Sequence, residues 1–119
     1  MRSEALESAL APYAAFEDGK RLRAGFTTGS AAAAAASAAA TLLFSGTAPL
    51  AVSIQTPVGA LLPIPIESAE FVTEGGARNA VAAVRKDAGD DPDVTDGLLF
   101  YASVRTEKSG AAGKSASGE

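Results

Sequence analysis

Residues 25–44 read GFTTGSAAAAAASAAATLLF, which is the strongest structural signal in the sequence. Its centre is a block of alanines over residues 31–40 that only Ser37 interrupts. Alanine has the highest intrinsic helix propensity, because it loses no side-chain entropy in a helix. The stretch therefore predicts a helix from about residue 30 to residue 44.

The ends of this helix carry recognisable signals. A side-chain oxygen of Thr28 or Ser30 is expected to accept a hydrogen bond from a backbone N–H two or three residues further on, as N-cap residues do. Gly46 suits the left-handed conformation that ends many helices. The small side chains would let a sheet or a flat ligand approach the helix closely, and both interpretations remain open.

The apolar run over residues 31–44 is shorter than a typical membrane span. A span needs roughly 20 strongly apolar residues, whereas this run includes Ser37 and Thr41 and consists mostly of weakly hydrophobic alanine. The first residues, Met1–Glu4, lack a basic segment followed by an apolar stretch, so we expect no signal peptide. The sequence therefore favours a cytoplasmic protein without membrane partners.

Two segments with alternating apolar residues predict a β-hairpin. The alternation covers residues 50–55 and 61–66, and the turn Thr56–Gly59 between them carries Pro and Gly at positions that favour them. Pro63 and Pro65 share one face of the second strand and remove two backbone donors, which predicts an edge strand. Further strands are expected near residues 70–73, over residues 79–87, which could also form a helix, and over residues 97–105.

The two ends of the chain are expected to lie outside this unit. Residues 3–16 predict a short helix that Pro12 cuts or kinks. The last residues form a Ser/Gly/Ala-rich stretch without core-forming side chains. We expect an N-terminal helix and polar connector over residues 1–24, a folded domain over residues 25–108 and a flexible tail over residues 109–119.

The order of these elements predicts an α+β fold. The chain has 119 residues, which is the usual length of one domain. Helices followed by hairpin-connected strands usually pack as two layers. We therefore expect a two-layer sandwich, in which the long alanine-rich helix covers a mainly antiparallel sheet of four to five strands.

The composition excludes several kinds of chemistry. The chain carries 10 basic and 14 acidic residues, so it lacks the overall positive charge typical of nucleic-acid binding. It has no cysteine, which excludes disulfides, thiolate nucleophiles and cysteine-ligated metals. It has no histidine, which excludes Ser-His-Asp triads and the HExxH zinc site. Acid–base chemistry would have to come from carboxylates, lysine or tyrosine.

The first candidate site is the turn that opens the alanine helix. A helix N-terminus offers unpaired N–H groups and a partial positive charge to phosphates and carboxylates. Thr27, Thr28 and Ser30 add hydroxyl groups, and Gly29 allows close approach of a ligand. The lysine of a P-loop is absent. An anion site and an ordinary structural cap both explain the turn.

The second candidate site is the loop at residues 86–97, KDAGDDPDVTDG, which holds five of the six aspartates. Crowding so many like charges costs stability. The carboxylates could ligate Ca²⁺ or Mg²⁺, act in acid–base catalysis with a raised pKa, or accept hydrogen bonds from a ligand or the backbone. The pattern of a calcium-binding loop is not matched, and Asx-turns with Pro92 fixing the bend are the structural alternative.

The two segments together resemble the CbiD family, the cobalt-precorrin-5B C1-methyltransferases of anaerobic cobalamin biosynthesis. The family pattern is R-x-G-[FY]-T-T-G-[ST] before an alanine-rich helix, then a P-x-G hairpin, an I-P-[IV] strand and a KDAGDDPDVTHG loop. The chain carries these elements in order from about residue 21 to residue 105. The resemblance covers most of this chain but only the N-terminal portion of a full-length family member.

The resemblance implies methyl transfer from S-adenosylmethionine to C1 of a cobalt tetrapyrrole, with the cobalt belonging to the substrate and no metal site on the protein. Positioning dominates the rate of such a reaction, so histidine and cysteine are not required. Lys20, Arg21 and Arg23 suit the carboxylates of the substrate. The residues that the resemblance implies for substrate or cofactor binding are Thr27, Thr28, Gly29, Ser30, Lys86, Asp87, Asp90, Asp91, Asp93 and Thr95, with Asp91 and Asp93 as the catalytic candidates.

Three positions depart from the family pattern. Ala31 stands in place of the family cysteine, Ser37 in place of a commonly basic residue and Asp96 in place of the family histidine. Family members also continue well beyond the matched part. The alternative interpretation is therefore a non-catalytic domain that binds a tetrapyrrole or a partner protein and lacks the methyl-donor half. The protein partner could be a second copy of this chain, in a homo-oligomer, or a missing C-terminal domain.

Two structural expectations follow for the candidate sites. Residues 27–30 and residues 87–95 are expected to lie side by side, because neither polar turn has a local need for the other. The crowded carboxyls of Asp87, Asp90, Asp91 and Asp93 are expected to include at least one with a raised pKa.

Overall fold

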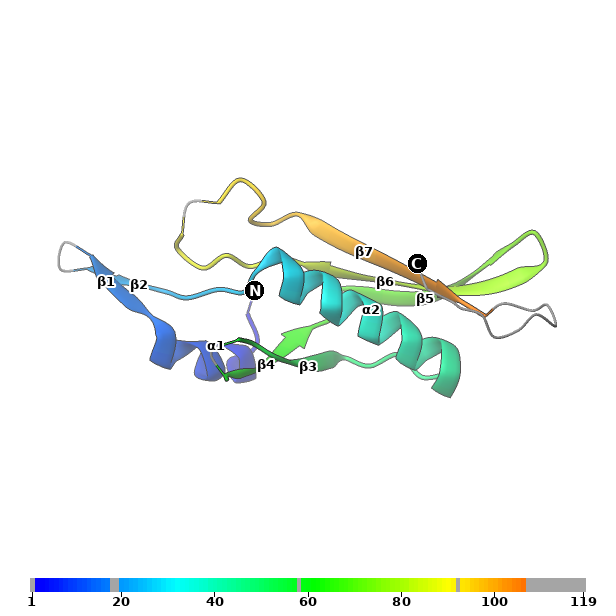
Figure 1. Cartoon of the computed structure of the whole chain (residues 1–119), viewed down its shortest axis with the longest axis horizontal. Coiled ribbons are helices and arrows are strands. Elements are labelled where there is room, and N and C mark those ends of the chain that lie inside the picture. Colours follow the sequence, from blue (N-terminus) through cyan, green and yellow to red (C-terminus); the bar gives the residue numbers. More distant parts are fainter. Residues whose placement is uncertain (1, 18–19, 58, 92, 107–119) are drawn as a thin grey trace.

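The computed structural model describes residues 2–17, 20–57, 59–91 and 93–106 (Figure 1). These residues form α-helices, a short 3₁₀ helix and antiparallel strands, which confirms the α+β class. The elements in chain order are α1 (Glu4–Leu10), η1 (Ala11–Tyr13), β1 (Ala15–Glu17), β2 (Lys20–Leu22), α2 (Thr28–Ser45), β3 (Ala51–Gln55), β4 (Leu61–Pro65), β5 (Ser68–Glu74), β6 (Ala77–Arg85) and β7 (Leu99–Arg105).

The alanine stretch forms α2, the longest element of the described chain. The prediction that Thr28 or Ser30 caps this helix is wrong. Thr27 is the N-cap, because its backbone is extended and its side-chain oxygen accepts a hydrogen bond of 3.1 Å from the Ser30 N–H. The helix ends as predicted at Gly46, whose φ of 80° places it in the left-handed region.

The strands pair antiparallel throughout and form the sheets β1–β2, β3–β4 and β5–β6–β7. Residues 79–85 are strand, as the β-branched residues favoured. The strands β3–β7 do not form one sheet but divide after β4. Pro63 and Pro65 lack the N–H groups that a further neighbour would need, and the chain turns at Ile66 into β5, which pairs with β6.

One face of the three-stranded sheet packs against α2 (Figure 1). The contact consists mainly of small side chains, so the helix and the sheet approach closely, as the alanine composition predicts. The fully buried residues of this layer include Ala34, Ala35, Ala38 and Ala39 of α2 and Ala80 and Ala82 of β6. The helix also contacts β3, so the β3–β4 hairpin extends the same core.

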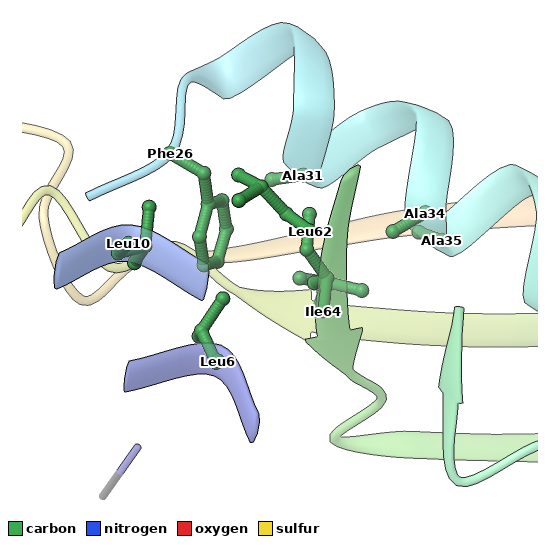
Figure 2. Close-up of a cluster of buried hydrophobic side chains, with 9 residues drawn as sticks. Leu6, Leu10, Phe26, Ala31, Ala34, Ala35, Leu62 and Ile64 are labelled. Carbon is green, nitrogen blue, oxygen red and sulfur yellow. The ribbon is translucent and has the colours of Figure 1, made fainter. Parts of the chain in front are cut away.

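Larger side chains close the core at the end where α2 begins. Figure 2 shows the Phe26 ring between Leu6 and Leu10 of α1 and Leu62 and Ile64 of β4. All five side chains are at most 4% exposed. Phe26 therefore fixes the chain immediately before the turn that opens α2.

The N-terminal helix is shorter than predicted. The helix ends at Leu10, because Pro12 enforces the 3₁₀ turn η1. The polar connector expected after this helix includes a short hairpin, in which Glu17 of β1 pairs with Lys20 of β2. That hairpin is too short to give a recognisable alternating pattern. The predicted tail over residues 109–119 lies outside the described residues.

The length and composition of α2 would allow it to cross a membrane, with 18 residues and a mean hydropathy of 1.2. A buried core helix can have the same length and hydropathy, so these two properties alone are weak evidence of a membrane span. The buried alanines of α2 pack on β6 and β7.

The packing of α2 predicts the effect of enlarging a buried alanine. Ala34 has no exposed surface, so Ala34→Leu should overpack the interface and lower the free energy of unfolding by about 1–3 kcal/mol. Ala33 is exposed on the same helix, so Ala33→Leu is the matched control and should change stability little. Urea denaturation checks both variants, and equal stabilities would contradict this face of the helix.

Candidate functional site

The two polar segments singled out in the sequence lie side by side, which confirms that expectation. The Phe26 N–H donates to the Asp87 carbonyl at 2.8 Å, and the Asp90 N–H donates to the Arg23 carbonyl at 3.0 Å. The Lys86 ammonium reaches across to the Thr28 hydroxyl at 3.2 Å. The start of α2 and the aspartate loop therefore form one structural unit.

Two glycines allow these backbones to approach each other. A Cβ atom added at Gly25 would lie 2.2 Å from the Asp87 carbonyl oxygen, and one added at Gly89 would lie 2.3 Å from the Arg23 carbonyl oxygen. Gly89 also has a φ of 70°, which side chains disfavour. Each motif thus contributes a glycine where the other motif's backbone leaves no room for a side chain.

Lys86 joins the two segments from inside the protein. Its side chain is 5% exposed, and its ammonium donates to Asp93 Oδ2 and Thr95 Oγ1, each at 2.7 Å, as well as to Thr28. An ammonium group has three protons, so these acceptors use all of its donors. A direct contact between Lys86 and a ligand stays a prediction.

Arg2 anchors the loop from the opposite end of the sequence. Its guanidinium makes two hydrogen bonds to the Asp87 carboxylate, at 2.7 and 3.1 Å, and further bonds to Glu7 and to the Ala24 carbonyl. The Arg2 side chain is only 7% exposed. Sequence reasoning missed this residue, because it lies 85 positions from its partner and no local pattern marks it.

Three further aspartates, Asp90, Asp93 and Asp96, hold the loop in shape. Asp90 accepts a hydrogen bond of 2.8 Å from the Arg23 N–H, and Asp96 accepts one of 2.8 Å from the Ala88 N–H. Asp93 accepts from the N–H and the hydroxyl of Thr95, which is an Asx-turn. Within the described residues, no group of three acidic side chains converges as a metal site would require. The carboxylates of Asp90, Asp93 and Asp96 therefore act as hydrogen-bond acceptors within the protein.

These contacts lower the pKa of three loop carboxyls. Burial alone would raise the pKa of Asp87, but hydrogen bonds from Arg2 and the Gly89 N–H hold it below 3.8. The Arg23 N–H lowers the pKa of Asp90, and the Lys86 ammonium, followed by Thr95, lowers that of Asp93. The prediction of a raised pKa is wrong for these three carboxyls, because each has its own donor.

A cleft of about 630 Å³ opens where the two segments meet. This volume lies within the usual range of small-molecule sites, about 300–1,000 Å³. Among the predicted site residues, the cleft is lined by Thr27, Thr28, Gly29, Lys86, Asp91 and Asp93. Arg23, Phe26 and Tyr13 complete part of its wall. Ser30, Asp87, Asp90 and Thr95 do not line the cleft and instead stabilise the segments behind it.

The cleft exposes hydrogen-bond donors at the start of α2. Within the described part of the chain, the N–H groups of Thr28 and Gly29 have no acceptor, as expected in the first turn of a helix. The Thr28 hydroxyl already accepts a bond from Lys86, so its own proton is available to a ligand. The side chains of Lys20 and Arg21 lie outside the described residues, whereas Arg23 is about half exposed.

The contact between the motifs predicts an unequal cost for two alanine substitutions. Gly97 has a φ of 84° and no atom near its missing Cβ, so Gly97→Ala should cost only the conformational strain, about 1–2 kcal/mol. Gly89→Ala should cost at least about 2 kcal/mol more, because the two backbones must separate and lose hydrogen bonds. Denaturation curves compare the two, and equal costs would contradict the close contact.

The lowered pKa of Asp87 predicts how stability changes with pH. Near pH 3.8 the unfolded chain then binds more protons than the folded one. The free energy of unfolding should therefore decrease as the pH falls from about 5 toward 2, and Arg2→Met should flatten this decrease. Arg85→Met, which removes an exposed ion pair with Glu67, is the control and should leave the slope unchanged. Stability that increases on acidification would contradict the assignment.

Comparisons with known proteins agree with the motifs. The CbiD family model matches residues 15–118. The chain is 48% identical over 95 residues to the cobalt-precorrin-5B C(1)-methyltransferase of Treponema denticola. This match covers 79% of this chain and 26% of that protein. It is 57% identical over 86 residues to the protein of the same name from Prosthecochloris aestuarii, covering 70% of this chain and 21% of that protein.

The chain spans about a quarter of the length of these curated relatives. The match lies in their N-terminal part. No solved structure matches the chain. The family model nevertheless covers most of the sequence, including both polar segments that form the cleft. The chain therefore belongs to the CbiD family, whose curated members are named as methyltransferases of a cobalt precorrin.

Proposed function

We propose that this chain contributes the N-terminal part of the substrate site in the methylation of cobalt-precorrin-5B at C1, in the cytoplasm. The observation that carries the proposal is the cleft at the meeting point of the two family motifs. S-adenosylmethionine, when bound, would supply the methyl group. The chain's own part is to bind and orient, because a ring carbon that attacks a methyl group in line needs position rather than proton transfer.

The donors of the cleft suit a carboxylated tetrapyrrole. The first N–H groups of α2, the Thr28 hydroxyl proton and the exposed Arg23 guanidinium are all donors, and carboxylates are acceptors. Lys86 supports this set from behind, because its ammonium fixes the Thr28 oxygen. The rim of the substrate would therefore bind at the N-terminus of α2.

The two catalytic candidates differ in their availability. Asp93 is engaged by Lys86 and Thr95, whereas Asp91 is exposed, lines the cleft and has no side-chain partner among the described residues. A free carboxylate suits the amino group of S-adenosylmethionine. We assign Asp91 to holding the methyl donor and Asp93 to shaping the loop.

A second candidate function is binding without catalysis. The chain corresponds to only about a quarter of each relative, so a tetrapyrrole could bind here while the methyl donor binds elsewhere. The two functions make the same prediction for substrate affinity and different predictions for methylation.

An absorption titration of the purified chain with cobalt-precorrin-5B tests the proposal. The chain should bind, and Thr28→Val should weaken binding about tenfold or more, because a hydrogen bond to a charged group contributes about 1.5–3 kcal/mol. Thr41→Val is the matched control, since Thr41 is exposed far along α2 and its hydroxyl donates only to the Ser37 carbonyl among the described residues. Absence of binding would contradict both functions.

The same samples then distinguish the two functions. With S-adenosylmethionine added, mass spectrometry should detect a singly methylated product if the chain is catalytically competent. Binding without any methylated product would support the non-catalytic alternative. Equal affinities of the Thr28→Val and Thr41→Val variants would show that the substrate does not bind at the start of α2.

A further inference from the structure

The cleft where the two polar segments meet also has an apolar wall, which comes from the N-terminal part of the chain. Tyr13 of η1, Ala15 of β1 and Leu22 of β2 line this wall. Ala15 and Leu22 are direct partners in the hairpin register, and directly paired residues project from the same face of a sheet. The polar groups assigned above lie elsewhere in the cleft, at the start of α2, at Arg23 and in the aspartate loop. One cleft therefore combines hydrogen-bond donors with an apolar surface.

The backbone that carries Tyr13 is held in place by its neighbours. The 3₁₀ turn η1 contains Pro12, whose ring fixes the φ angle. Leu10, at the end of α1, is 3% exposed and belongs to the same buried core cluster as Phe26 (Figure 2). Phe26 lies immediately before the turn that opens α2. The core therefore fixes Tyr13 relative to the donors of the cleft.

The side chain of Tyr13 is available to a ligand. Tyr13 is 47% exposed, and among the described residues no hydrogen bond or ring contact engages its side chain. A tyrosine ring offers a large and rigid contact surface at a low cost in side-chain entropy. A single exposed aromatic residue needs no explanation by itself. Its place in a cleft that also holds hydrogen-bond donors points to a ligand with an apolar face and an edge of acceptors.

Resting on the proposed function, we propose that the Tyr13 ring stacks on the face of the tetrapyrrole macrocycle whose carboxylates bind at the start of α2. A carboxylated macrocycle has an apolar, conjugated centre and an anionic rim, which match the two parts of the cleft. Aromatic rings stack favourably on such faces in an offset arrangement. A small carboxylate without a conjugated ring would use only the donors. Tyr13 is then a binding residue that selects macrocycles over other carboxylates.

Binding titrations with two tetrapyrroles test this role. The ligands are cobalt-precorrin-5B and uroporphyrin I, a metal-free porphyrin that carries carboxylates around its rim. Tyr13→Ser should weaken binding about fivefold or more, because it removes the stacking contact. Tyr13→Phe keeps the ring and should bind like the unaltered chain. Tyr101→Ser is the matched control, because Tyr101 is 66% exposed and does not line the cleft, and thermal melting checks that all variants are folded.

Chemical modification of the unaltered chain gives a second readout that needs no variant. Tetranitromethane nitrates tyrosine rings and oxidises thiols, and the sequence has 2 tyrosines and no cysteine. Nitrotyrosine can therefore form only at Tyr13 and Tyr101, which trypsin separates by cleaving after Lys20. A bound tetrapyrrole should protect Tyr13 and leave the nitration of Tyr101 unchanged, as mass spectrometry of the peptides measures.

The outcomes separate the stacking from the proposed function. Cobalt-precorrin-5B that binds but leaves Tyr13 unprotected contradicts the stacking and leaves the proposed function intact, and equal affinities of the Tyr13→Ser and Tyr101→Ser variants do the same. Uroporphyrin that binds and protects Tyr13, when cobalt-precorrin-5B does not bind, supports the stacking and contradicts the proposed function. Failure of both ligands to bind, or binding of uroporphyrin alone without protection of Tyr13, contradicts both.

Discussion

The close contact between the backbones at Gly25 and Gly89 holds the two halves of the site together. Neither position has space for a Cβ atom, because the nearest backbone oxygens would lie within 2.3 Å of it. The hydrogen bond from Phe26 to Asp87 and the bond from Asp90 to Arg23 require this approach. Phe26 is also the aromatic centre of the core in Figure 2. The loop is thus attached to the same residue that positions the start of α2.

This attachment explains how the fold tolerates so many aspartates. Like charges near one another would normally repel and raise a pKa. Here each of three carboxylates meets a different cation: Asp87 meets Arg2, Asp90 meets Arg23 and Asp93 meets Lys86. Two of those cations come from segments far away in the sequence. The charges are therefore balanced pairwise, and the loop gains rigidity from its acids.

The sequence predicts the elements of this fold better than it predicts their contacts. An alanine run gives a helix and alternation gives a strand, because both depend on residues close in the chain. The pairing of Arg2 with Asp87 joins residues 85 positions apart, so no local pattern reveals it. The expectation of a raised pKa failed for Asp87 and Asp90 for the same reason, since the neighbouring acids were visible in the sequence and their partners Arg2 and Arg23 are distant.

The sequence predicted where the first of the two sheets ends, but not how the chain continues into the second. Pro63 and Pro65 marked β4 as an edge, which the pairing confirms. That the chain then continues into β5 and pairs with a different neighbour depends on how both sheets pack around α2. The two motifs were recognisable as a family pattern and were expected to lie side by side, but the close backbone approach at Gly25 and Gly89 was not predicted.

The arrangement of charges also limits how a ligand can be oriented in the cleft. Asp87, Asp90, Asp93 and Asp96 all accept hydrogen bonds from the protein, so their charges are engaged. Asp91 keeps an exposed carboxylate in the same cleft that holds the open N–H groups of α2. Among the described residues, the free carboxylate of Asp91 and the donors of α2 lie in one cleft, an arrangement that favours ligands with a cationic and an anionic part and fixes their direction. Under the proposed function, the donors would orient the carboxylated substrate and Asp91 the cationic methyl donor, which is the positioning that methyl transfer requires.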